Sequence, residues 1–168
     1  RLMERTGSWS EARDYFEYIQ AADPRRLPAE ALKIIELGIA SGKLQTSDIS
    51  VSDARTVALG RIAADKASLV ALERDARAAS ASAATAMAGG DAFLSYGQAA
   101  KAEELYQLAL AKPGADTPRL LTRLGIAQAD LGKTAEAQAT FAKVTGLRAP
   151  IAALWSAYAK SKVAAPAQ

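Results

Sequence analysis

Three pairs of carboxylates lie close enough in the sequence to suggest acid–base chemistry. They are Glu103 with Glu104, Glu73 with Asp75, and Asp130 with Glu136. Two positioned carboxylates are a common arrangement for general acid–base catalysis. Each pair lies in a helical stretch rich in lysine or arginine, where carboxylates ordinarily form ion pairs on a solvated face. We therefore expect these pairs to be structural and not catalytic.

Other reactive groups are missing from the sequence. It contains no histidine and no cysteine, which excludes a Ser-His-Asp or Cys-His nucleophile, a disulfide framework and a zinc site built from imidazole or thiolate. Gly89-Gly90 and Gly125 have no preceding strand and no Gly-Lys-Ser/Thr motif, so phosphate binding is not expected. The sequence predicts no catalytic residue, no metal site and no cofactor, and thus not an enzyme.

The balance of charge argues against nucleic acid as a partner. Lys and Arg number 21 against 18 Asp and Glu, for a net charge of +3. The basic residues are dispersed among acids and lack the interleaved aromatic residues that stack on bases. No nucleic-acid binding is expected.

The sequence also predicts no membrane-spanning segment, because no stretch approaches the roughly 20 apolar residues that such a helix needs. The N-terminal residues lack the apolar core of a signal peptide. Because these residues have the pattern of a helix interior, we expect a soluble piece of a longer protein, from which an upstream export signal could have been removed. Cytoplasm and periplasm both stay open as its compartment.

Composition favours an all-α fold. About a quarter of the 168 residues are alanine, which has the best helix propensity, and only 6% are aromatic. The length suits one ordinary domain or a short stack of repeats.

An internal repeat is visible at a spacing of 35 residues, the separation of Gly97 and Gly132. Each glycine follows one predicted helix and precedes another, where a left-handed conformation closes the first helix. Five residues later comes an alanine, and four after that an aromatic, so both lie on one helical stripe. These steps are Ala102/Tyr106, Ala137/Phe141 and, after Gly7 at the N-terminus, Ala12/Phe16.

Glycine and proline add to the pattern. Gly90 and Gly125, again 35 residues apart, lie inside predicted helices and mark where two helices approach most closely. Pro24, Pro113 and Pro150 follow the aromatic residues by eight, seven and nine positions and are predicted to end the second helix of each pair.

These residues resemble the tetratricopeptide repeat (TPR) family, whose unit of 34 residues is a pair of antiparallel helices with an A-x3-F step and a closing proline. The best copy spans residues 118–150, a second spans 83–112, and a half-repeat precedes them. The matching positions of the best copy are Leu121, Leu124, Gly125, Gly132, Ala137, Phe141 and Val144. It departs from the family at Gln128, where tyrosine is usual, and the second copy departs at Ala86 and Gly89.

The resemblance implies an all-α, TPR-like helical-hairpin solenoid, a right-handed superhelix of about eight helices. We expect an irregular N-terminal half with a partial hairpin at 1–80, two repeats and a terminal helix at 81–162, and a frayed tail at 163–168. Residues 45–80 do not resemble the family; there we expect one or two helices, with an N-cap at Ser52-Asp53.

In the family, the first helix of each pair lines a concave groove. Carried over by register, the groove residues are Met87, Asp91, Leu94, Arg119, Thr122, Arg123, Ile126 and Asp130. Arg119 and Arg123 stand where some members clamp a peptide carboxylate, but Asp91 and Ala88 replace the asparagines of such a clamp. A carboxylate clamp is therefore not expected here.

The aromatic residues divide into two groups. Trp9, Tyr106 and Phe141 are at packing positions and are expected in the core. Trp155 and Tyr158 lie on the terminal helix, where a missing next repeat would leave an apolar face to be covered by self-association or by the rest of the chain.

The function we expect is a non-catalytic scaffold that binds a protein or peptide partner in the concave groove. The alternative is a structural spacer or oligomerisation segment of a larger exported or membrane-associated protein, with a homo-oligomer formed through the terminal helix.

Overall fold

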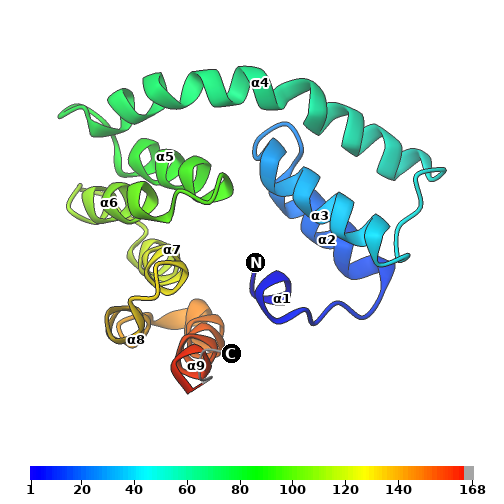
Figure 1. Ribbon diagram of the computed structural model, residues 1–168. Helices are drawn as coiled ribbons and strands as arrows, with labels where there is room; N and C mark the ends of the chain where they lie inside the picture. The colour runs from blue at the N-terminus through cyan, green and yellow to red at the C-terminus, as the bar shows by residue number, and fades with distance from the viewer. Residues whose placement is uncertain (165–168) are drawn as a thin grey trace. The chain divides into compact units, whose positions relative to one another are not determined.

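Helices make up all the regular secondary structure of the computed structural model, which describes residues 1–164 of the chain (Figure 1). Nine α-helices and one short 3-10 helix occur in these residues, and no strand does. The all-α prediction is confirmed, with one α-helix more than the approximate number expected. The predicted frayed tail at 163–168 lies mostly outside the described residues, and the last helix continues to Ala164.

Contacts divide the chain into two compact units, Arg1–Ser68 and Leu69–Gln168. The division falls inside α4, a single helix of 29 residues at Ile49–Arg77. The first part of α4 therefore packs in the N-terminal unit and the remainder in the C-terminal unit.

The N-terminal unit begins with α1 (Leu2–Thr6), α2 (Ala12–Ala22) and α3 (Pro28–Ala40). A capping box starts α2: the Asp14 carboxylate accepts hydrogen bonds from the backbone N–H groups of Ser10 and Glu11, at 2.9 and 3.1 Å. These bonds hold the pKa of Asp14 below its usual value. Pro28 occupies the first turn of α3, where a missing N–H costs nothing. The helices α2 and α3 lie side by side (Figure 1).

The core of this unit differs from the prediction at the aromatic position. Tyr15, and not Phe16, is the buried ring, with 2% of its surface exposed, and Phe16 is half-buried. Gly38 of α3 makes room for it, because a Cβ atom there would lie 3.0 Å from Cδ1 of Tyr15. Trp9 stacks on Tyr15 with ring centroids 4.4 Å apart. The step from Ala12 to Phe16 therefore does not place the main core residue of this hairpin.

The helix α4 starts three residues earlier than the predicted cap. Asp48 precedes it, and its Oδ1 accepts a hydrogen bond from the backbone N–H of Ser50 at 2.8 Å. The predicted N-cap at Ser52-Asp53 is therefore wrong, since the helix begins at Ile49 and the Asp48 side chain caps one N–H group of its first turn. One continuous helix covers the region for which one or two were expected. Its exposed apolar residues include Leu59 and Val70.

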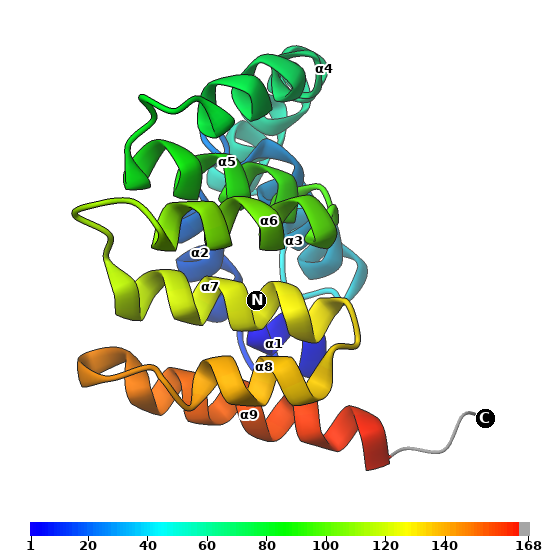
Figure 2. The same ribbon diagram turned by 90° about the vertical axis from the view of Figure 1, so that its left-hand side faces the viewer.

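The C-terminal unit is a series of packed helices (Figure 2). After the end of α4 come α5 (Ala83–Ser95), α6 (Ala99–Leu110), α7 (Thr117–Asp130) and α8 (Thr134–Phe141). Gly97 and Gly132 close α5 and α7 with φ angles of 72° and 74°, the left-handed conformation that glycine adopts most readily. Two helical hairpins, α5–α6 and α7–α8, therefore recur with the predicted spacing.

Each hairpin is held by the same close contact. A Cβ atom built at Gly90 of α5 would lie 2.7 Å from Cδ1 of Tyr106 in α6, and one at Gly125 of α7 would lie 2.7 Å from Cδ1 of Phe141 in α8. Tyr106 and Phe141 are 0% and 3% exposed. The prediction that these glycines mark close helix approaches, with the aromatic residues in the core, is confirmed.

The position of Pro150, after α8, differs from the prediction. Pro150 does not end the second helix of the last pair, because α8 already stops at Phe141. The 3-10 helix η1 (Gly146–Arg148) follows, and Pro150 is the second residue of α9 (Ala149–Ala164). Proline is favoured in a first helical turn, so it begins α9 in the way that Pro118 begins α7. On α9, Trp155 is 3% exposed and Tyr158 is half-buried.

These contacts predict a contrast between helical glycines. Replacing Gly90 or Gly125 by alanine should lower the free energy of unfolding by about 1–3 kcal/mol, because the added methyl group overlaps a buried ring. Gly60 in α4 is the matched control: nothing lies within 4 Å of its Cβ position, so Gly60→Ala should raise stability by up to about 1 kcal/mol. Urea unfolding followed by circular dichroism measures all three. Equal effects at the three positions would contradict the packing described.

Candidate functional site

The eight predicted groove residues lie on α5 and α7. Met87, Asp91 and Leu94 are on α5, and the other five are on α7. Four of the eight are buried, namely Asp91, Leu94, Thr122 and Ile126. Met87, Arg119 and Arg123 are half-buried, and Asp130 is exposed.

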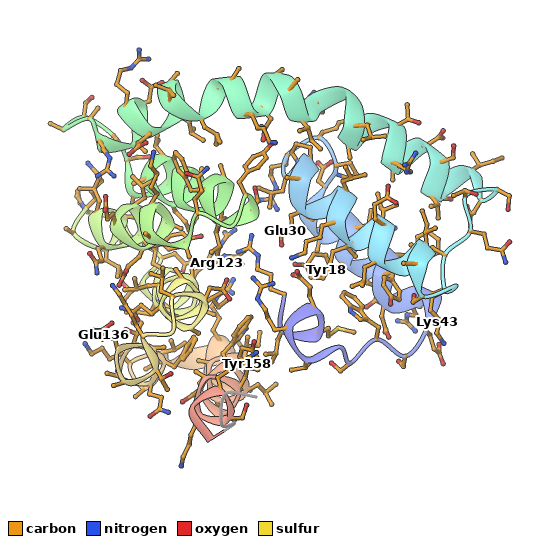
Figure 3. All side chains as sticks on the ribbon, in the orientation of Figure 1. Tyr18, Glu30, Lys43, Arg123, Glu136 and Tyr158 are labelled. Atoms are coloured by element: carbon orange, nitrogen blue, oxygen red, sulfur yellow. The ribbon has the colours of Figure 1, made fainter. Side chains whose placement is uncertain are left out.

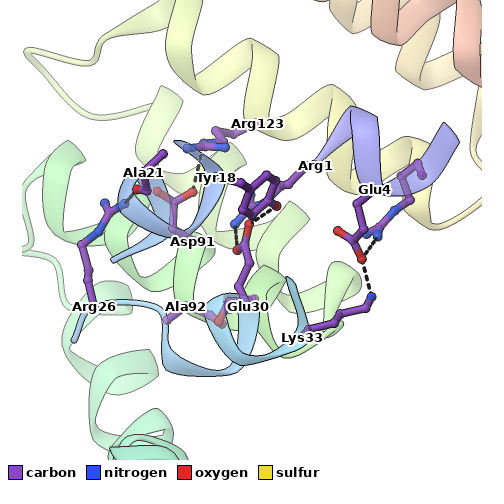
Figure 4. A network of polar contacts seen from close by, with 12 residues as sticks. Arg1, Glu4, Tyr18, Ala21, Arg26, Glu30, Lys33, Asp91, Ala92 and Arg123 are labelled. Atoms are coloured by element: carbon purple, nitrogen blue, oxygen red, sulfur yellow. Dashed lines mark hydrogen bonds and ion pairs between the residues drawn. The ribbon is translucent and has the colours of Figure 1, made fainter. Parts of the chain in front are cut away.

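Asp91 and Arg123 form a polar bridge between helices (Figure 4). The Tyr106 hydroxyl of α6 donates a hydrogen bond to Oδ1 of Asp91 at 2.7 Å. Nε of Arg123 lies 3.1 Å from the same oxygen. The bridge joins α5, α6 and α7, so the two residues that the sequence assigns to a groove also hold two hairpins together. It neutralises the charge of Arg123, which gives a physical reason why Arg123 is unsuited to clamping a free carboxylate.

Arg119 is in a different situation. Its backbone N–H donates a hydrogen bond to Oδ1 of Asp116, the N-cap residue of α7, at 3.2 Å. Within residues 1–164, no hydrogen bond or ion pair is recorded for its guanidinium group. Of the two arginines predicted to line a groove, Arg119 is therefore the one that forms no ion pair among the described residues.

A second polar cluster is one that the sequence did not indicate. Glu103 of α6 was expected on a solvated face but is 7% exposed. Its carboxylate accepts hydrogen bonds from Nε2 of Gln128 at 3.3 Å and from Nζ of Lys133 at 2.7 Å, and the latter bond raises the pKa of Lys133. The cluster includes Gln128, the position at which the sequence departs from the tetratricopeptide pattern. In the sequence, the one feature that indicates burial of Glu103 is its position directly after the core residue Ala102.

Glu73, Asp75 and Glu104, three further carboxylates of the predicted pairs, form surface ion pairs. Glu73 lies 2.6 Å from Lys101 and 3.0 Å from Arg77, and Arg77 also pairs with Glu104 at 2.5 Å. The hydrogen bond from Lys101 contributes most to lowering the pKa of Glu73. Asp75 pairs with Arg74. These carboxylates have the ion-paired environment expected of a solvated helix face.

Asp130 and Glu136, the third predicted pair, lie on α7 and α8, and both are exposed. Glu136 is labelled in Figure 3. Exposure keeps both carboxylates in water, without the desolvation by which active sites tune such groups.

The N-terminal unit holds a buried polar cluster of its own (Figure 4). The Glu30 carboxylate of α3 accepts a hydrogen bond from the Tyr18 hydroxyl at 2.6 Å and one from Nε of Arg1 at 2.7 Å. Burial opposes ionisation of Glu30, but the bonds from Arg1 and Tyr18 outweigh it and lower its pKa. Burial, with the nearby Glu30 charge, raises the pKa of Tyr18. Sequence reasoning missed this cluster, although Glu30 stands beside the core residue Ala31.

Among residues 1–164, no group of three or more acidic side chains is arranged to hold a metal ion. None of the helices in that range is both long enough and apolar enough to cross a bilayer.

Comparison with known proteins gives no relative: no family model, no curated protein and no solved structure matches this chain. The resemblance to tetratricopeptide repeats therefore stays a prediction from the sequence pattern.

The Asp91 bridge predicts a specific cost for removing one hydroxyl group. Tyr106→Phe keeps the ring against Gly90 but takes a donor from a buried carboxylate, and should cost about 1–3 kcal/mol of unfolding free energy. Tyr158→Phe is the matched control, because the Tyr158 hydroxyl makes no hydrogen bond within residues 1–164. Chemical denaturation of both variants makes the comparison. A cost for Tyr106→Phe no larger than that for Tyr158→Phe would contradict the bridge.

The Glu30 cluster predicts a dependence of stability on pH. Its pKa is lower in the folded state than its usual value of 4.5, so ionised Glu30 stabilises the fold above that value, and this contribution is lost as the pH falls below it. At pH 7, Glu30→Gln should cost about 1–3 kcal/mol. The difference from the parent protein should shrink in acid. Thermal unfolding between pH 3 and pH 7 tests this, with the exposed Glu17→Gln as a control; a constant difference would contradict the prediction.

Proposed function

We propose that this chain is a non-catalytic scaffold that binds a protein or peptide segment in a groove formed by the first helices of TPR-like hairpins. The observation that carries the proposal is the repeated contact of Gly90 with Tyr106 and of Gly125 with Phe141. Stacked repeats of this kind produce extended surfaces from successive equivalent helices, here α5 and α7. Such surfaces are suited to recognition.

The chemistry of the side chains supports a non-catalytic role. The sequence has no histidine or cysteine, and the most deeply buried carboxylates, Asp91, Glu103 and Glu30, accept bonds from fixed donors. For Glu30, the bonds from Arg1 and Tyr18 lower the pKa of the carboxyl group, which favours its ionised form. These groups act as structural links between helices.

Within the proposed groove, Arg119 is the residue best placed to select a partner. It is half-buried beside the first turn of α7 and its guanidinium has no recorded ion pair in the described residues. An arginine binds carboxylates through two parallel N–H donors. The partner segment is therefore expected to present an acidic side chain or a terminal carboxylate to Arg119, without the full clamp that some TPR proteins have.

The alternative, an oligomerisation segment of a larger exported or membrane-associated protein, is supported by the exposed apolar residues Leu147, Ile151 and Leu154 near the last helix. It predicts that the chain self-associates. Sedimentation at increasing concentration tests it: a monomer at all concentrations would contradict the oligomerisation version.

The groove proposal is tested by capture and then by purified binding. Affinity capture with the chain, followed by mass spectrometry, supplies candidate partners. For a partner that binds in purified form, Arg119→Glu should weaken binding about tenfold or more, because it replaces attraction by repulsion at a half-buried site. Arg61→Glu makes the same charge change at an exposed position of α4 and should have little effect. Equal affinity for both variants would contradict the groove as the binding site.

A further inference from the structure

The N-terminal unit contains a cavity of about 360 Å³ between α2 and the first turns of α4. Its lining includes three residues of each helix: Phe16, Ile19 and Asp23 of α2, and Ser50, Asp53 and Val57 of α4. In both sets the residues are spaced by three and then four positions, so each set lies on one face of its helix. The cavity therefore lies between two facing helix sides, and its volume is within the range of sites that bind small groups.

Apolar side chains form one part of the cavity wall. Ile19 is 5% exposed, and Phe16 and Val57 are half-buried. Part of the Phe16 ring and of the Val57 side chain is therefore accessible from the cavity. A wall of this kind suits the aliphatic stem of a long side chain whose polar end stays near water.

Charged side chains form another part of the wall. The exposed Asp53 carboxylate makes no hydrogen bond or ion pair within residues 1–164. Asp23, with a φ angle of 57°, is held in place because its Oδ1 accepts a hydrogen bond from the backbone N–H of Arg25 at 2.9 Å. The guanidinium of Arg25 also lines the cavity. Two carboxylates and one guanidinium leave a local charge of −1, which favours a cationic ligand over an anionic one.

We propose that this cavity binds an arginine side chain of a partner peptide. The aliphatic stem lies against Ile19 and Val57, and the guanidinium stacks on the Phe16 ring. Its N–H groups donate to the carboxylates of Asp23 and Asp53. Lysine fits less well, because its compact, strongly hydrated ammonium cannot stack in this way. The cavity belongs to the N-terminal unit and the groove residues to α5 and α7, so the inference goes beyond the proposed function.

The probes are three capped tripeptides that differ in the residue between two glycines: arginine, citrulline or glutamate. Citrulline keeps the shape of arginine without its charge. Nuclear magnetic resonance titration of the complete, isotope-labelled chain measures both affinity and place of binding. The arginine peptide should bind with a dissociation constant on the order of 1 mM, as a single anchoring side chain allows. It should shift the amide signals of the cavity lining. The citrulline peptide should bind at least about fivefold more weakly.

Substitutions in the chain test the two carboxylates. Asp53→Asn should weaken binding of the arginine peptide about threefold to fivefold, as expected for one exposed ion pair. Adding Asp23→Asn should bring the loss to about tenfold or more, and asparagine tolerates the positive φ at that position. Asp75→Asn is the matched control, because it makes the same change on an exposed residue of α4. It should bind as the parent does.

Removing the positive charge at the cavity tests the sign of the ligand. Arg25→Gln should strengthen binding of the arginine peptide about twofold or more, because it removes a like charge. Arg25 is exposed, so this substitution should leave the fold unchanged. The amide spectrum of each variant verifies that it is folded.

Several results would overturn the proposal. Absence of saturable binding, signal shifts away from the cavity lining, equal affinity for arginine and citrulline, or equal losses in Asp53→Asn and Asp75→Asn would each do so. Binding of the glutamate peptide that Arg25→Gln abolishes would assign the cavity to an anionic group instead. The groove proposal is tested at Arg119 of α7, so failure here leaves that proposal standing, and failure of Arg119→Glu leaves this one.

Discussion

The architecture of the C-terminal unit depends on two helix crossings at which glycine leaves space for an aromatic ring. Gly90 receives Tyr106 and Gly125 receives Phe141, with the same ring atom at the same distance from the missing side chain. Protein interiors are packed too densely to absorb an extra methyl group at such a contact. The crossings therefore fix how closely the helices of each hairpin approach, and their repetition gives successive hairpins the same internal geometry.

Buried carboxylates add specific polar contacts between helices to this apolar packing. Asp91 joins α5 to α6 and α7, and Glu103 joins α6 to α7 and to the start of α8. A buried charge is tolerated only when it is paired and hydrogen-bonded, so each carboxylate favours one register of its helices over a shifted one. These bridges occupy charges such as Arg123 that would otherwise be open to a partner. In the proposed groove, Arg119 is the cation that lies outside both bridges.

Much of the C-terminal unit could be predicted from sequence because its signals are local. The glycines at 97 and 132, the aromatic residues at 106 and 141 and their spacing all appear in the chain and in the fold. What could not be predicted depends on tertiary partners. Burial of Glu103 depends on Gln128 of α7 and on Lys133 just before α8. Tyr15, buried in place of Phe16, packs against Trp9 and lies close to Gly38 of α3. Pro150 permits either the end of one helix or the start of another, and the turn after α8 decides between them.

The most direct test of the repeated crossing is the proton spectrum of the two glycines. A ring packed against a backbone shifts nearby protons strongly upfield, and protons this close give nuclear Overhauser effects. The packing predicts upfield Hα resonances for both Gly90 and Gly125, with cross-peaks to the rings of Tyr106 and Phe141 respectively. Ordinary glycine shifts without these cross-peaks, at either position, would contradict it.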